Sequence, residues 1–322
     1  MNVDGVTNND SGDGDSGANN LQNFPALTRA VTNASNRVAV GGTLNSTANT
    51  FYRIEIFSNA SGDASGNGEG QTYLGFVNVR TDSGGNATWG TEIMANVAVG
   101  AVISTTATRL DASFNPVETS EFGPNTTTVN QTLIVTNTND TINGDTSSVA
   151  ALIATPGGDG ISLREAITAA NASGTIDLIL FNIAGVGPHT ITPVTVALPT
   201  LTSAIVIDGS TEPDFAGTPV IVLDGDNLAV NGLTLTSTAD GSTIRGLVIR
   251  DFAGDGIEVS ANSNNSTFAG NFLGRLTATG GDAGAAEANT GYGLEVIGAG
   301  NTIGGETAAD RNVTAGNGLR GI

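Results

Sequence analysis

The sequence predicts an all-β fold in two parts: a β-sandwich over residues 23–124, then a parallel β-solenoid over residues 125–322 that begins with a single α-helix at about residues 162–173. Three observations lead to this prediction. Short strand patterns separated by turn residues fill the first part. A repeat of about 24 residues runs through the second part. Only one segment, "GDGISLREAITAANASG", has a clear helical pattern.

The first part contains at least five strand patterns, which are "NRVAVGGTLN", "TFYRIEIFSN", "TYLGFVNVRTD", "NATWGTEIM" and "GAVISTTATRLD". In the second of these, Ile54 and Ile56 alternate with charged residues, as expected for a strand with one buried face. The stretch "TDSGGNAT" at 81–88 predicts a hairpin turn. This many short strands indicates an Ig-like β-sandwich, with Trp89, the only tryptophan, in its core.

The second part repeats short apolar runs such as "AIVIDGS", "VIVLDGD", "NGLTLTS" and "DGIEVS". The realigned pairs, separated by 24, 24 and 25 residues, are Gly232 and Gly256, Thr243 and Thr267, and Gly293 and Gly318. The longer step from Gly256 to Gly293 contains the Gly- and Ala-rich stretch at 275–292, which predicts an inserted loop. A regular period with three strand-like runs predicts stacked coils that share one core.

The helical segment carries start and stop signals as well as an apolar stripe. Ser162 and Glu165 form an S-x-x-E capping box, and apolar residues follow from Leu163 at helical spacing. Gly174 stands where a residue in the left-handed region commonly follows a helix. Because an open solenoid end exposes apolar core and unpaired strand edges, we expect this helix to cover the N-terminal mouth of the solenoid.

The segment "DGISLREAITAANAS", preceded by "TNTNDTINGDTSSVAALIATPG" and followed by "IDLILFNIAGVGPHTIT", resembles the CSLREA-type module that opens right-handed parallel β-helices in large bacterial surface proteins. Ile161 stands where that motif has its cysteine. The stretches "GNGEGQTYLGFVNVRTDSGGNAT" and "ETSEFG" resemble the Ig-like sandwiches found beside such helices. The resemblance implies an extracellular or cell-surface location and an adhesin-like role.

Composition excludes several classes of function. The net charge is −20, with 31 acidic residues against 11 basic ones, all of them arginine, so nucleic acid and anionic membrane surfaces are not expected partners. The apolar runs are too short for a membrane span, so membrane insertion is not expected. Cysteine is absent, which removes thiol nucleophiles and Cys-ligated zinc, and nothing indicates an organic cofactor. The single histidine, His189, has no serine-centred motif nearby, which argues against a catalytic triad.

Residues 1–22 form an acidic junction rich in Asn, Asp and Gly. One interpretation is a solvated linker. The other is a calcium loop, because Asp10, Asp13 and Asp15, with the amide oxygen of Asn9, supply hard oxygen ligands among flexible glycines. No closing glutamate completes an EF-hand pattern.

Two groups of charged residues keep a polysaccharide-active β-helix enzyme open as an alternative. Asp208 and Asp224 end similar strands, so they are either paired carboxylates of a glycoside hydrolase, stacked about 5 Å apart, or Asp-Gly turns stacked on one another. Arg250, Asp251 and Asp255 are either the base and calcium ligands of a lyase or surface residues that pair with one another.

The function we expect is a non-catalytic structural or adhesive module. Its expected partners are neighbouring copies, adjacent modules of the same protein and surface glycans. The pattern also stops at Ile322 in mid-repeat, so we expect the last coil to be covered by a neighbouring copy, head to tail, as in a filament.

Overall fold

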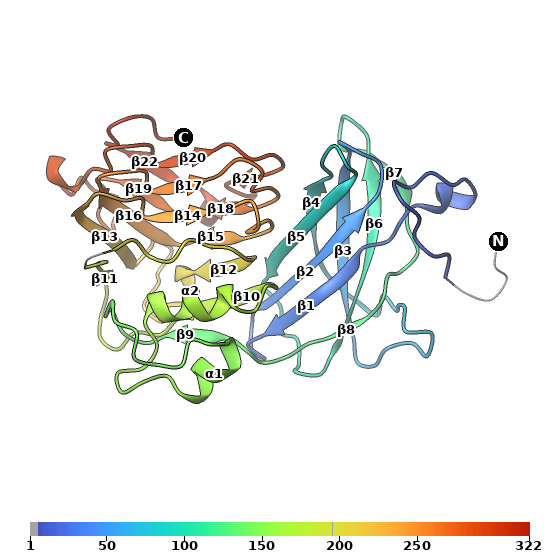
Figure 1. The fold of residues 1–322 in the computed structure, drawn as a ribbon, viewed down its shortest axis with the longest axis horizontal. Helices are drawn as coiled ribbons and strands as arrows, with labels where there is room; N and C mark the ends of the chain where they lie inside the picture. The colour runs from blue at the N-terminus through green and yellow to red at the C-terminus, as the bar shows by residue number, and fades with distance from the viewer. Residues whose placement is uncertain (1–5, 195) are drawn as a thin grey trace. The chain divides into compact units, whose positions relative to one another are not determined.

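The computed structural model describes residues 6–194 and 196–322, and nearly all of its regular structure is β. The chain divides into two compact units, Met1–Asn130 and Gln131–Ile322 (Figure 1). The boundary therefore lies six residues beyond the predicted one (130 − 124 = 6). Within the part of the chain that the structure describes, no helix is long and apolar enough to cross a membrane.

The first unit, which we call the antiparallel unit, consists of two antiparallel sheets. One sheet has the order β1-β2-β5, and the other has the order β4-β3-β6-β7, with β8 also paired to β6. A short 3-10 helix, η1 (Ala18–Leu21), precedes the first strand. The strands are β1 (Ala26–Thr32), β2 (Val38–Asn45), β3 (Phe51–Asn59), β4 (Thr72–Arg80), β5 (Asn86–Ile93), β6 (Val102–Leu110), β7 (Pro116–Thr119) and β8 (Thr126–Thr127).

One apolar core lies between these two sheets. Ile54 and Ile56 are fully buried while their charged neighbours are partly exposed, which confirms the predicted alternation. Trp89 is also fully buried, as predicted. The predicted hairpin at 81–88 is wrong: β4 pairs with β3 and β5 pairs with β2, so the turn carries the chain from one sheet to the other. Strand β1 was not among the predicted strands.

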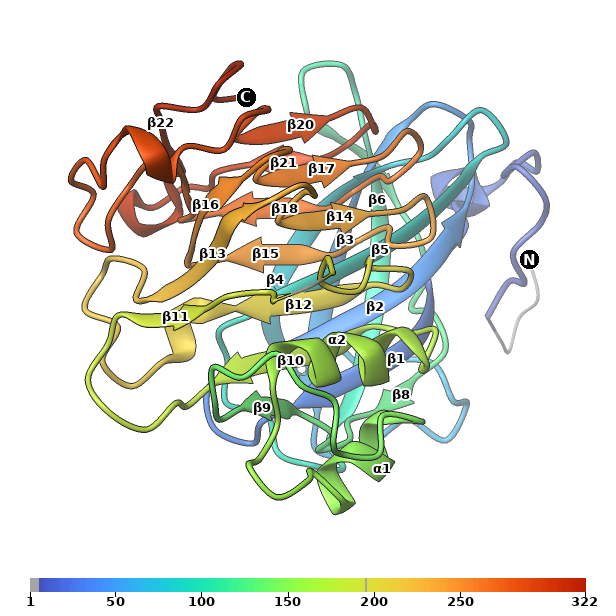
Figure 2. The same cartoon turned by 60° about the vertical axis from the view of Figure 1, so that its left-hand side comes forward.

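The second unit, which we call the parallel unit, has three parallel sheets whose orders are β9-β10-β12-β15-β18-β21, β11-β13-β16-β19-β22 and β14-β17-β20 (Figure 2). From β12 onward the chain visits the three sheets in turn, and we call each such passage a coil. This arrangement is compatible with a parallel β-helix. The strands are β9 (Leu133–Val135), β10 (Asp177–Phe181), β11 (His189–Ile191), β12 (Ile205–Asp208), β13 (Ile221–Leu228), β14 (Leu233–Leu235), β15 (Thr243–Arg245), β16 (Leu247–Phe252), β17 (Ile257–Val259), β18 (Thr267–Ala269), β19 (Phe272–Gly274), β20 (Leu294–Val296), β21 (Thr302–Ile303) and β22 (Val313–Ala315).

The strand registers test the predicted repeats. Leu233 pairs with Ile257, and Thr243 pairs with Thr267, which confirms both steps of 24 (257 − 233 and 267 − 243). The stacking of Gly293 on Gly318 is wrong, because the backbone N–H of Gly293 donates to the carbonyl of Arg320 instead. The matching residue is Gly321, whose carbonyl accepts from the N–H of Leu294 as that of Gly256 accepts from the N–H of Leu233, so this step is 28 residues (321 − 293).

Two helices lie between β9 and β10. The first, α1 (Val149–Ala154), is capped by the Ser148 side chain and was not predicted. The second, α2 (Leu163–Asn171), lies within the predicted range, and Ser162 forms the capping box with Glu165. Its apolar residues are fully buried in the same core as the strands of the parallel unit.

Candidate functional site

The candidate functional site is a group of four charged side chains on the sheet that runs from β11 to β22. Asp224 lies on β13, Arg250 and Asp251 lie on the next strand of that sheet, β16, and Glu287 ends the 3-10 helix η3 (Ala285–Glu287) in the inserted loop. Carboxylate oxygens of the three acids lie within 4.8 Å of one another. The sequence predicted Asp224, Arg250 and Asp251 here only as alternatives, and it missed Glu287.

Arg250 lies among these carboxylates. Its Nε donates to Asp224 Oδ2 at 2.9 Å, and the same nitrogen lies 3.3 Å from Glu287 Oε2. Asp224 and Arg250 are also direct register partners on adjacent strands. Burial raises the pKa of Asp251, and the nearby carboxylates of Asp224 and Glu287 raise it further. The group is thus an acidic cluster whose charge is partly neutralised by one arginine.

The predicted pairing of Asp208 with Asp224 is wrong. Asp208 ends β12 in one sheet and Asp224 lies on β13 in another, because the two strands occupy consecutive sides of one coil rather than the same side of successive coils. The register partner of Asp208 is Arg245, whose Nε lies 3.7 Å from Asp208 Oδ1. The two aspartates therefore neither flank a common site nor stack as turns.

Asp255 has a different local role. Its Oδ1 accepts from the backbone N–H of Tyr292 at 2.6 Å, and its own N–H donates to the side chain of Asn231 at 2.7 Å. Asp255 thus links the segment before β14, at Asn231, to the segment before β20, at Tyr292. It is not part of the cluster around Arg250.

Buried asparagines form a second polar feature of the parallel unit. Asn271, which is fully buried, donates from Nδ2 to the carbonyl of Ile244 at 2.9 Å and accepts from the N–H of Leu247 at 3.1 Å. Asn312 in the following coil accepts from the N–H of Asn271 at 3.0 Å and donates to the carbonyl of Phe268.

The same pattern recurs at the next corner of the coil. Asn289 accepts from the N–H of Phe252 and donates to the carbonyl of Ile249, both at 3.1 Å. Asn317 donates to the carbonyl of Leu273 at 3.0 Å and accepts from Asn289. The side-chain amides thus satisfy corner backbone groups that would otherwise be buried without partners.

The predicted calcium ligands lie in the N-terminal segment of the antiparallel unit. Carboxylate oxygens of Asp10, Asp13 and Asp15 lie within 4.8 Å of one another. Asp13 accepts from the N–H of Asn23 at 2.9 Å and from the hydroxyl of Ser46 at 2.8 Å. Burial raises the pKa of Asp13, and the charges of Asp10 and Asp15 add to this rise against the hydrogen bonds that lower it.

The fourth predicted ligand, Asn9, uses its amide differently. Its Oδ1 accepts from the N–H of Phe24 at 2.9 Å, and its Nδ2 donates to the carbonyl of the same residue at 2.8 Å. The amide oxygen therefore already holds the start of the segment against the chain near β1.

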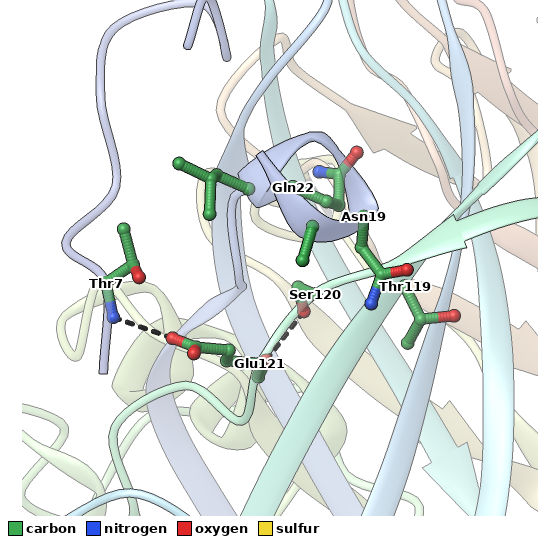
Figure 3. A pocket seen from close by; sticks show the side chains of 8 residues that line it. Thr7, Asn19, Gln22, Thr119, Ser120 and Glu121 are labelled. Atoms are coloured by element: carbon green, nitrogen blue, oxygen red, sulfur yellow. Dashed lines mark hydrogen bonds between the residues drawn. The ribbon is translucent and has the colours of Figure 1, made fainter. Parts of the chain in front are cut away.

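The N-terminal segment also closes a small cavity. Its volume is about 160 Å³, and it is lined by Thr7, Ala18, Asn19, Leu21, Gln22, Thr119, Ser120 and Glu121 (Figure 3). The backbone N–H of Thr7 donates to Glu121 Oε2 at 2.7 Å across it (Figure 3). The cavity is smaller than the roughly 300 Å³ of ordinary ligand sites. These contacts show that residues 7–22 are bound to the sheets, so the segment is not a free linker.

Sequence reasoning missed Glu287 because it lies in the inserted loop, 37 residues after its ion-pair partner Arg250 (287 − 250). The one available signal was that Glu287 is the only glutamate among the small residues of the loop at 275–292. Comparison with protein-family models finds no matching family, and comparison with curated proteins finds no match. The resemblance to Ig-like and CSLREA-type modules therefore rests on the quoted motifs alone.

Proposed function

We propose that this chain is a non-catalytic structural and adhesive module of a large bacterial extracellular or cell-surface protein. The observation that carries the proposal is that charged and amide side chains of the parallel unit contact neighbouring coils. Arg245 lies between Asp208 of the preceding coil and Asp310, which belongs to the second coil after it. Arg250 likewise lies between Asp224 of the preceding coil and Glu287 of the following one. These arginines and carboxylates pair with one another across coils. They therefore hold the stack together and are not available as catalytic groups.

We also propose that α2 caps the stack of an Ig-like and right-handed β-helical module. Arg164 pairs with Asp140 at 2.7 Å and donates to the backbone carbonyls at 196–197. Glu165 accepts from the backbone N–H groups at 143–144, both at 2.7 Å. The charged residues of the motif thereby anchor two loops beside the helix, while its apolar residues enter the core. This local role suits an end cap.

A second candidate function is a calcium-dependent polysaccharide lyase. The observation in its favour is the cluster of Asp224, Asp251 and Glu287 beside Arg250, because such carboxylates bind Ca²⁺ and a lyase of this kind needs a basic residue, the role considered for Arg250. Against it, the Arg250 guanidinium already contacts two of these carboxylates. A base must instead face the substrate. We therefore prefer the structural function.

The deciding experiment incubates the purified protein and its Arg250→Gln variant with a panel of polyuronates and neutral polysaccharides in calcium buffer. Unsaturated products are followed by ultraviolet absorbance and new reducing ends by a colorimetric assay. We expect no cleavage by either protein, and a lower melting temperature for the variant. Cleavage by the wild type that Arg250→Gln abolishes without loss of stability would establish the lyase. Retention of an intact glycan without cleavage supports the adhesive role.

We further propose that Asp10, Asp13 and Asp15 bind Ca²⁺, since a cation would relieve the repulsion among three adjacent carboxylates.

For association, we propose that the coil at 302–322 packs against a further coil from a neighbouring copy or an adjacent module. Ile303 and Leu319 of this coil are 42% and 60% exposed. Light scattering over a concentration series tests self-association. A strictly monomeric species at high concentration would contradict the head-to-tail form.

A further inference from the structure

The only histidine of the chain meets two carboxylates at the edge of a sheet in the parallel unit. His189 begins β11, the first strand of its sheet. Glu212 and Asp214 follow the 3-10 helix η2 (Gly209–Thr211), which leads toward β13. One ligand atom from each of the three side chains lies within 4.8 Å of the others.

Two polar atoms of these side chains, His189 Nε2 and Asp214 Oδ1, are buried without a hydrogen-bond partner in the described chain. The His189 side chain as a whole is 8% exposed. Glu212 Oε1 lies 3.6 Å from His189 Nε2, which is longer than a hydrogen bond. Leaving such atoms unsatisfied is costly, and both belong to side chains that meet here, so they indicate that something else binds at this point.

The other oxygen of each carboxylate is already held by the backbone. Glu212 Oε2 accepts from the N–H of Ile183 at 3.0 Å, and Asp214 Oδ2 accepts from the N–H of Gly187. The strand that carries His189 is fixed as well, because the backbone N–H of His189 donates to the carbonyl of Val220 at 2.8 Å. These bonds fix the two carboxylates beside the imidazole, as outer hydrogen bonds orient the ligands of metal ions.

We propose that His189, Glu212 and Asp214 form a site for a divalent transition-metal ion, with zinc as the representative ion. One imidazole nitrogen with two carboxylate oxygens suits zinc or manganese, whereas calcium prefers oxygen ligands alone. Two ligand atoms on one tetrahedral zinc stand about 3.4 Å apart, given metal–ligand distances of about 2.1 Å. The separation of 3.6 Å between Nε2 and Oε1 is close to this value.

The bound ion would join two segments of the chain at the edge of a sheet, the strand β11 and the connection at 209–220. The same two carboxylates bind the loop at 182–188 through its backbone N–H groups. Among the described residues β11 has one neighbouring strand, β13, so such a cross-link would stabilise this edge of the sheet.

The test uses the full chain without a histidine tag, so that every imidazole resonance belongs to His189. Metal-free protein is titrated with zinc chloride while calorimetry and nitrogen-15 NMR of the imidazole are recorded. We expect one equivalent of zinc to bind and the Nε2 resonance to shift, and we expect calcium chloride to leave it unchanged. His189→Asn and Glu212→Gln should each weaken binding at least about tenfold. Asp224→Asn, in the other acidic cluster of this unit, is the matched control and should bind zinc normally.

Two results would overturn the proposal. One is an imidazole spectrum that stoichiometric zinc does not change. That result would show that His189 and Glu212 are a buried pair that binds no metal. The other is undiminished zinc binding by both site variants. If the variants fail to fold, the wild-type spectrum alone decides between a metal site and a buried pair.

Discussion

The antiparallel unit and the parallel unit hold their strands together in different ways, although both draw on the same small and β-branched residues. Strand β3 of the antiparallel unit has nine residues and pairs along its whole length with β6. Strands β14 and β17 of the parallel unit have three residues each and, among the named strands of the described residues, pair with the equivalent strands of adjacent coils. The first unit gains stability from long ladders around one core, and the second gains it from the number of stacked coils.

The polar side chains of the two units also have different roles. In the parallel unit, buried asparagines and arginine–carboxylate pairs link successive coils at the corners and on the sheet faces. In the antiparallel unit, the acidic N-terminal segment is bound along the outside of the sheets. The comparison teaches that short stacked coils are joined by polar links between one coil and the next, whereas the long antiparallel strands are joined by their backbone ladders.

The largest effect is expected from a charge in the core beside α2. Ile167→Asp or Leu163→Asp places a carboxylate at a fully buried position and should cost more than about 4 kcal/mol, enough to unfold the parallel unit. Trp89, the only tryptophan, lies in the other unit, so its fluorescence transition should be unchanged. Circular dichroism reports the loss of the parallel sheets. Thr168→Asp, at a partly exposed position of α2, is the control, and a native-like melt for both core variants would show that the helix is not a cap.

The next largest effect should follow loss of one corner amide. Asn271→Ala leaves the buried carbonyl of Ile244 and the N–H of Leu247 unsatisfied, which should destabilise the parallel unit by about 3 kcal/mol. Calorimetry of the variant measures this loss. Asn182→Ala, at an exposed position of the same unit, should change stability by less than about 0.5 kcal/mol. Equal losses of stability in the two variants would show that the corner amides do not stabilise the stack.

Calcium should act on the antiparallel unit alone. If Asp10, Asp13 and Asp15 bind it only in the folded state, a hundredfold excess over Kd raises stability by about 2.7 kcal/mol. The Trp89 fluorescence melt of calcium-loaded protein should therefore shift down on addition of EDTA, and Asp13→Asn should abolish the shift. A Trp89 melt that EDTA leaves unchanged would contradict the calcium site.

The smallest predicted effect is a pH dependence carried by Glu165. Burial raises its pKa, but the hydrogen bonds from Ser162, Gly144 and Asn143 together outweigh this and lower the pKa below its ordinary 4.5. A lowered folded pKa means that the stabilisation is present above about pH 4.5 and is lost as the pH falls through the folded value. Glu165→Gln should thus cost about 1–2 kcal/mol at pH 7 and progressively less in acid. A cost independent of pH, measured by denaturant unfolding, would show that the carboxylate charge does not matter.

Local patterns predicted the elements well and their partners less well. The alternation at Ile54 and Ile56, the capping box at Ser162 and the repeat at Gly232 depend on neighbouring residues or on a constant period, so the sequence contains them directly. The turn at 81–88 has ordinary hairpin residues, yet it joins different sheets, because the choice of sheet depends on the whole core.

The candidate sites depend on distant residues and could not be assembled from the sequence. In the sequence, Asp208 and Asp224 end similar apolar runs, but only the fold reveals that these runs occupy different sides of a coil. Glu287 reaches Arg250 through the inserted loop, and His189 meets Glu212 across 23 residues (212 − 189). Motif spacing does not contain such long-range contacts.

The most direct test of the contrast between the units is native-state hydrogen exchange of the intact chain under increasing denaturant. If the parallel unit is a stack in which each coil contacts only its neighbours, protection should be highest in the central strands β12, β15 and β16 and fall toward β21 and β22. Strands β2, β3, β5 and β6 of the antiparallel unit should instead lose protection together. Equal protection of the backbone amides from exchange in all strands of the parallel unit would contradict the stack of coils.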